Sequence, residues 1–184
     1  MLIPEVCFQL KDGRDAVIRN PKEEDAEAML QMLYTLAAET EFTIRYPEEC
    51  DYTLEEERHI LAQNNASAHQ AMLICEVEGE IAGSCMVSVC TRIKTRHRAS
   101  VAIGLVQKYW NQGIGTKMFQ EMIRIAEGFS EVSQIELAFI EGNTRAQRLY
   151  EKQGFRIVGV YPNATRLKDG TLLHEYIMIK QLQR

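Results

Sequence analysis

A strand, a glycine pair and an amphipathic helix follow one another between residues 100 and 128, and this run constrains the fold more than any other feature. Residues 100–106 alternate branched apolar with small side chains, which is the period of a β-strand with one uncrowded face. Residues 116–127 place apolar side chains at helical spacing. Gly113 and Gly115 lie between the two, so free backbone N–H groups at a positive helix terminus are expected to hold a phosphate or pyrophosphate.

The glycine pair fits neither of the two common nucleotide loops. The order Gly115-Thr116-Lys117 inverts the Lys and Ser/Thr of a P-loop, and the upstream glycine is missing. A dinucleotide fingerprint needs a third glycine, and the preceding strands pair as hairpins. Two interpretations remain from the residues alone: a tight turn without a ligand, or a pyrophosphate loop of another lineage.

The order of the expected elements predicts an α/β (α+β) fold with a mixed, mostly antiparallel sheet flanked by helices, not a doubly wound parallel sheet. Strands are expected at 15–19, 71–77, 81–90, 100–106, 134–140, 155–161 and 172–179, and helices at 21–38, 54–61, 116–127 and 143–153. Asn20 is the expected N-cap of the first helix, and Thr53 with Glu56 forms a capping box for the second. With 184 residues and 46% hydrophobic content, residues 1–184 are expected to form one domain.

Several classes of function do not fit the composition. No apolar run is long enough to cross a bilayer, and the start lacks the pattern of a signal peptide, so we expect no membrane association and a cytoplasmic location. The basic cluster at 92–98 is too small for a nucleic-acid interface. The five cysteines contain no CxxC pair, and the histidines are not spaced as ligand pairs, so no metal is expected. Those histidines are His59, His69, His97 and His174.

Two motifs carry a resemblance to a known family. WNQGIG at residues 110–115 is similar to the R/Q-x-x-G-x-G/A motif that binds acetyl-CoA in the GNAT (GCN5-related) N-acetyltransferase superfamily, with Trp110 in place of the usual Arg or Gln. NTRAQRLYEKQGF at residues 143–155 is similar to the family's N-x-x-A-x-x-L-Y-x-x-x-G-F signature. Both motifs have the expected order and spacing, and the resemblance covers residues 70–161 well and the first 65 in outline.

The resemblance implies a GNAT-type fold whose splayed strand pair binds coenzyme A, with acetyl-CoA as cosubstrate. Leu105, Val106 and Gln107 would align the pantetheine arm, and an N–H near Leu105 or Val106 would polarise the thioester carbonyl. Asn143 would contact the pantetheine side, although it is also a plausible helix N-cap. The residues expected around the pyrophosphate are Trp110, Asn111, Gln112, Gly113, Ile114, Gly115 and Thr116.

For the chemistry, the resemblance implies direct acetyl transfer to a primary amine in a ternary complex. Tyr150 is expected to be the general acid that protonates the departing thiolate, although an aromatic on the inner face of a short helix is also ordinary packing. Family positions that carry a glutamate are occupied here by Ser100, Val101 and Ala138, so the general base is open. Glu136 is the named candidate, and the others are Glu39, Glu41, His97 and Glu141.

The sequence does not identify the acceptor amine. The acid-rich segment 39–57 would favour a cationic amine such as a polyamine, an aminoglycoside or a basic peptide, but an exposed acidic face is the commoner explanation of such a run. Small molecules, antibiotics and protein N-termini all stay open, and so does a homodimer. The alternative functions are a non-catalytic acyl-CoA sensor and an interaction module on the same fold.

Overall fold

One eight-stranded sheet forms the centre of the protein in a computed structural model that describes residues 1–183. Its strand order is β1-β2-β3-β4-β5-β6-β8-β7, and β5 with β6 is the parallel pair in an otherwise antiparallel sheet. The expected mixed, mostly antiparallel sheet is therefore confirmed. The strands are β1 (Val6–Gln9), β2 (Asp15–Arg19), β3 (Gln70–Val77), β4 (Glu80–Val89), β5 (Arg98–Leu105), β6 (Gln134–Ile140), β7 (Arg156–Arg166) and β8 (Leu172–Gln181).

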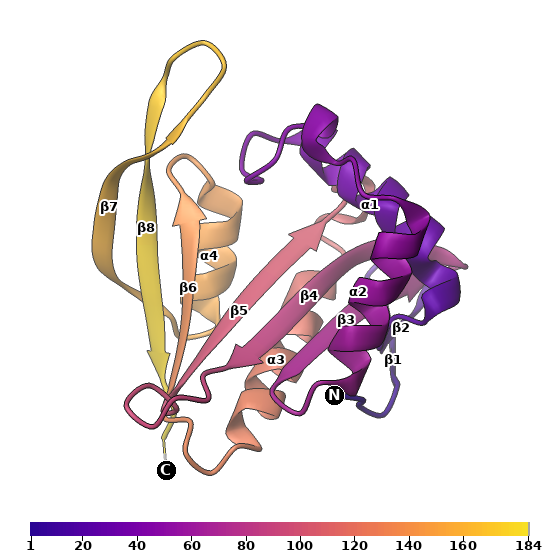
Figure 1. Ribbon diagram of the computed structural model, residues 1–184, viewed down its shortest axis with the longest axis horizontal. Helices are drawn as coiled ribbons and strands as arrows, with labels where there is room; N and C mark the ends of the chain where they lie inside the picture. Colours follow the sequence, from indigo (N-terminus) through magenta and orange to yellow (C-terminus); the bar gives the residue numbers. More distant parts are fainter. Residues whose placement is uncertain (184) are drawn as a thin grey trace.

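Four α-helices cover the two faces of the sheet (Figure 1). Helices α1 (Ala26–Glu39) and α2 (Leu54–Ala66) lie on one face. Helices α3 (Ile114–Glu127) and α4 (Thr144–Lys152) lie on the other, where the Phe119 and Tyr150 rings are 5.2 Å apart. The short loops on either side of α3 and α4 therefore bring both sequence motifs to the same face of the sheet.

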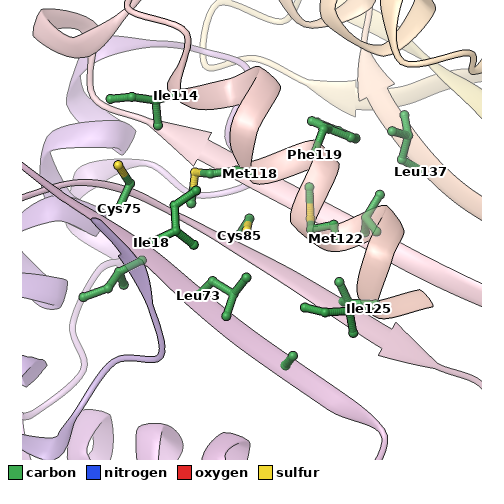
Figure 2. Close-up of a cluster of buried hydrophobic side chains, with 14 of the residues drawn as sticks. Ile18, Leu73, Cys75, Cys85, Ile114, Met118, Phe119, Met122, Ile125 and Leu137 are labelled. Atoms are coloured by element: carbon green, nitrogen blue, oxygen red, sulfur yellow. The ribbon is translucent and has the colours of Figure 1, made fainter. Parts of the chain in front are cut away.

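Helix α3 supplies the centre of the hydrophobic core. Its apolar residues recur at three- and four-residue spacing, so they form one stripe that packs on the sheet. Figure 2 shows Met118, Phe119, Met122 and Ile125 of α3 facing side chains of β2, β3 and β4. Those partners are Ile18, Leu73, Cys75 and Cys85, all buried. This packing fixes α3, and with it the glycine loop at its start, against the middle of the sheet.

Strands β5 and β6 are paired over only three residues and then separate (Figure 1). The pairing joins residues 98–100 to 134–136, and a bidentate ion pair between Arg98 and Glu136 lies at this closed end, with N–O distances of 2.7 and 2.9 Å. Beyond it each strand keeps its outer partner, β4 or β8, along its length. The result is a V-shaped opening inside the sheet.

Most expected elements are confirmed, and the differences have local causes. Helix α2 begins at the Thr53–Glu56 capping box as predicted but continues to Ala66. Strand β1 was missed because its four residues are too few to show a period. Asn20 is not the N-cap of α1, which follows a short 3-10 helix at Glu23–Asp25.

Instead, the Asn20 side chain ties the N-terminal segment to the sheet. Its Nδ2 donates to the carbonyl oxygens of Met1 and Met72, both at 2.9 Å, and its Oδ1 accepts from Ile3 N–H at 2.8 Å. Three hydrogen bonds from one side chain connect segments far apart in the sequence, which gives Asn20 a structural role.

We predict that Asn20→Ala lowers the free energy of unfolding by about 2 kcal/mol, because it leaves partly buried backbone groups without partners. Urea unfolding followed by circular dichroism measures the change. Gln181→Ala is the control, since its exposed amide makes one side-chain hydrogen bond, to Gln134, and its loss should change stability by less than about 0.5 kcal/mol. Equal effects of both variants would contradict the structural role of Asn20.

Candidate active site

A cavity of about 210 Å³ occupies the opening between β5 and β6. Its wall is built from β5 and β6, from α3 and α4, and from the α1–α2 loop and the β7–β8 hairpin. Most of the lining is apolar: Phe42, Ile44, Val101, Ala102, Ile103, Phe119, Leu137, Ala138, Phe139 and Ile140. The polar members are Asn143, Tyr150, Thr165 and Glu175.

Alternate backbone groups of β5 are directed into this opening. Val106 N–H donates to Ala82 O, and Arg98 O accepts from Cys90 N–H, both at 3.0 Å. Because hydrogen-bonded pairs alternate along an antiparallel ladder, the even-numbered residues of β5 bond to β4 and the odd-numbered ones face the opposite way. Beyond the three-residue pairing with β6, the residues that face the opening are Val101, Ile103 and Leu105.

This alternation corrects part of the expected backbone site. The Val106 N–H is held by β4 and cannot reach a thioester carbonyl. The Gln107 N–H donates to Glu39 Oε2 at 2.7 Å, so it is also occupied. The backbone of Leu105 does face the opening, and so does that of Ile103, which was not among the expected site residues. The period-2 alternation of residues 100–106 was the signal for Ile103.

The glycine loop presents free donors at the start of α3. Gly113 is the helix N-cap with a φ of +95°, a conformation that glycine adopts readily, and open space surrounds its Cα. The first bond of the helix runs from Lys117 N–H to Gly113 O at 3.1 Å. The preceding N–H groups of Ile114, Gly115 and Thr116 therefore lack partners within the helix and can receive an anion.

Trp110, Asn111 and Gln112 lie beside this helix start. The Trp110 indole N–H donates to Leu105 O at 2.7 Å, and the Arg145 guanidinium stacks 4.1 Å over its ring. Arg145 also donates to Asn111 Oδ1 at 2.8 Å. The family motif has Arg or Gln at position 110. Here that position is Trp110, and the cation beside the loop is Arg145 from the first turn of α4. The Gln112 Oε1 is buried and unpaired within residues 1–183.

Tyr150 points a protonated phenol toward the cavity from α4. Aromatic rings surround it, with Phe119 and Phe139 centroids at 5.2 and 6.0 Å, and burial raises the pKa of its hydroxyl to about 12. Among residues 1–183, no group hydrogen-bonds to that hydroxyl. Asn143 also lines the cavity while its Oδ1 caps α4 by accepting from Ala146 N–H at 3.2 Å, so both of its expected positions are compatible.

The named candidate for the general base is elsewhere. Glu136 is bound by Arg98 at the closed end of the V and does not line the cavity. Glu141 accepts from His174 N–H at 3.1 Å, and His97 lies in the β4–β5 loop, where its carbonyl accepts from Ser133 and Gln134. None of these side chains reaches the cavity lining, nor do Glu39 and Glu41.

The acid-rich segment 39–57 is explained by local structure. Glu49 and Glu56 cap the helical turns in which they lie. Each carboxylate accepts a hydrogen bond of 2.8 Å from the N-cap backbone, Tyr46 N–H and Thr53 N–H. Glu57 is buried, and burial raises the pKa of its carboxyl. Glu39 holds Gln107, as described above. The segment therefore supplies caps and cross-links, and no carboxylate from it lines the cavity.

Two loops meet across the open end of the V (Figure 1). The Lys168 N–H in the β7–β8 hairpin donates to the Tyr46 hydroxyl at 3.0 Å, and the Lys168 ammonium lies 4.2 Å from the centre of the Tyr46 ring. The same ammonium forms an ion pair with Glu48. This Tyr46–Lys168 bridge joins the α1–α2 loop to the β7–β8 hairpin, and nothing in the sequence pattern pointed to it.

Glu175 is the one acid among the cavity residues, and sequence reasoning missed it. It stands on β8 opposite Ile140 and Tyr161 and is half-buried. The signal in the sequence was a single acid within the otherwise apolar run of residues 172–179.

Comparisons with known proteins decide the family. The model of the acetyltransferase (GNAT) family matches residues 30–155, which include the whole V, the glycine loop and α4. The chain belongs to the GNAT acetyltransferase family. As a GNAT protein it has the acyltransferase fold that both motifs indicated, with the strand pair splayed as expected.

Full-length relatives share this architecture. The L-amino acid N-acetyltransferase AaaT of Escherichia coli is 26% identical, over 90% of this chain and 98% of its own. A GNAT-family acetyltransferase from Streptococcus pneumoniae is 28% identical with a TM-score of 0.84, covering 91% and 99% of the two chains. The structure of yncA from Salmonella typhimurium, which contains acetyl-CoA, is 16% identical with a TM-score of 0.77, covering 91% and 94%.

Two features are absent from the described residues, 1–183. No group of three or more His, Cys, Asp or Glu side chains is placed to hold a metal ion. No helix in that range has both the length and the apolar run that crossing a membrane requires.

We predict that the Tyr150 phenol stays protonated at pH 11, because ionising it would place an anion among apolar rings. Carbon-13 NMR of ring-labelled tyrosine measures this, with the resonance assigned by its loss in Tyr150→Phe. The same resonance in the urea-unfolded protein is the control, because the phenol is then in water, where a tyrosine titrates at about pH 10. A Tyr150 resonance that moves in the folded protein as it does in the unfolded one would contradict the burial of the phenol.

Proposed function

We propose that the protein is an N-acetyltransferase that passes the acetyl group of acetyl-CoA directly to a primary amine. The observation that carries this proposal is the cavity between β5 and β6, where unpaired backbone groups of β5 and the free hydroxyl of Tyr150 face the same space. Family membership supports the reaction class.

The residues around the V fit acetyl-CoA in two parts. The N–H and C=O groups of Ile103 and the N–H of Leu105 match the amides of a pantetheine arm, which would pair with β5 as a further strand would, whereas the Leu105 C=O is held by the Trp110 indole. The helix start at Gly113–Thr116 offers unpaired donors and a positive dipole for the pyrophosphate. Trp110, Asn111 and Gln112 lie beside the start of α3, and Asn143 lines the cavity.

The chain's own groups then perform the transfer. The Ile103 or Leu105 N–H stabilises the negative charge that grows on the thioester oxygen when the amine attacks the carbonyl carbon. As the C–S bond breaks, Tyr150 donates its proton to the departing sulfur, so no thiolate is left in an apolar cavity. A phenol with a pKa of about 12 is fully protonated at neutral pH, which suits a proton donor.

The acceptor proposed is a primary amine of a small molecule or peptide. The relative AaaT is named for L-amino acids, which makes these the first acceptors to test. A non-catalytic acyl-CoA sensor on the same fold is disfavoured, because binding alone gives no reason for a free phenol and a carboxylate in the cavity. The cytoplasmic location and the homodimer stay predictions.

We predict that saturating acetyl-CoA, at about 100 times its dissociation constant, stabilises the fold by about 2.7 kcal/mol and raises the melting temperature by about 5–10 °C. Differential scanning fluorimetry measures the shift. NAD and ATP are the matched controls, since each has an adenosine phosphate but no pantetheine arm. If they stabilise as well as acetyl-CoA does, the assignment of β5 to pantetheine is wrong.

Tyr150→Phe is predicted to lower kcat about 100-fold or more, because it removes the proton donor and keeps the ring among its aromatic neighbours. Release of free thiol in the presence of an accepted amine reports kcat, and calorimetry should show unchanged affinity for acetyl-CoA. Tyr161→Phe, at an exposed position, is the control and should leave kcat as in the wild type. Wild-type turnover by Tyr150→Phe would show that solvent supplies the proton.

A further inference from the structure

Glu175 lines the cavity and has no assigned role, and the proposed reaction still lacks a general base. Acetyl transfer needs an acceptor for the proton of the ammonium, and Glu136 is held by Arg98 outside the cavity. Glu175 is the one carboxylate in the lining, and Tyr150 contributes to the same lining from α4.

The surroundings of Glu175 leave its carboxylate uncommitted. Its backbone is fixed in the sheet, opposite Ile140 on β6 and Tyr161 on β7. Its neighbour His174 accepts from Asn163 N–H at 3.2 Å. Among residues 1–183, no Lys, Arg or His forms an ion pair with Glu175, and no hydrogen bond occupies its side chain.

We propose that Glu175 binds the acceptor's ammonium and removes its proton, and that the acceptor is a primary monoamine with an apolar body. This assignment rests on the proposed function. The carboxylate supplies one negative charge, whereas the rest of the acceptor meets Phe42, Ile44 and other apolar side chains. Phe42 and Ile44 are exposed and uncharged, so a second ammonium would gain no ionic partner there and would forgo the apolar contacts of the acceptor's body, which disfavours polyamines.

The protons balance through Glu175 and Tyr150. Glu175 takes one proton from R–NH3⁺, and the nitrogen lone pair forms the C–N bond at the thioester carbonyl. When the C–S bond breaks, the sulfur leaves with its electron pair and takes the Tyr150 proton. The tyrosinate then takes the proton left on the amide nitrogen, and Glu175 releases its own to solvent. Apolar walls favour the first transfer because it converts two charges into two neutral groups.

The test is Glu175→Gln, which removes the charge and keeps the size of the side chain. With 2-phenylethylamine as acceptor, kcat/KM should fall about 100-fold or more, as for loss of a positioned base. Calorimetry should show that 2-phenylethylamine binds the enzyme–CoA complex at least about 10-fold more weakly, with acetyl-CoA affinity unchanged. Glu175→Asp keeps the carboxylate and should retain part of the rate. Glu151→Gln, an exposed acid on α4, is the matched control and should behave as wild type.

The acceptor class is tested on the wild-type enzyme. The kcat/KM for spermidine should be about 100-fold or more below that for 2-phenylethylamine. Equal rates for the two amines, or a Glu175→Gln variant with wild-type rate and amine affinity, would overturn the assignment of Glu175 while the proposed function stands. If the wild type binds acetyl-CoA but acetylates none of the amines tested, the proposed function fails, and the assignment of Glu175 fails with it.

Discussion

The short pairing of β5 with β6 is the constraint on which the rest of the structure depends. Three residues on each strand are joined, and Arg98 with Glu136 reinforces that end. Past this point the two strands are kept apart because each is held by its own outer neighbour over many residues. The opening therefore exists without a ligand, and its polar edge is backbone, which every sequence has. This explains how one fold can keep a cofactor site while its side chains vary.

Packing on the α3/α4 face positions the glycine loop and Tyr150 beside that opening. The apolar stripe of α3 fixes the helix against the sheet, so the free N–H groups at Gly113–Thr116 stand at a set distance from the β5 edge. Helix α4 packs on α3 through the Tyr150 and Phe119 rings. The phenol is therefore positioned by aromatic contacts and not by a hydrogen bond, which leaves its proton free for chemistry. The proposed proton donor is thus also a member of the hydrophobic core.

Local signals predicted the fold well, and they directed attention to β5 and to the glycine loop at the start of α3. The capping box at Thr53, the strand at 134–140 and the helix capped by Asn143 all depend on neighbours in sequence. The acid–base assignment depended on distance in space, which a sequence does not show. Glu136 and Glu175 look alike as acids on strands, but the first meets Arg98 across a strand pair and the second faces the cavity. Likewise, the sequence does not show that Glu49 and Glu56 cap helical turns or that Glu39 binds the Gln107 backbone.

An unpaired strand edge is usually a route to aggregation, because any other extended chain can add to it. Here the edge of β5 beyond Ser100 lies inside the sheet, facing β6 across the V, with α3 and α4 on one face. A folded chain cannot enter such a gap edge-on, whereas a slender, linear amide can. The width of the gap between β5 and β6 would therefore favour a thin ligand, and a bound pantetheine arm would connect the two halves of the sheet. Amide hydrogen exchange at Ile103 and Leu105 would report that connection directly.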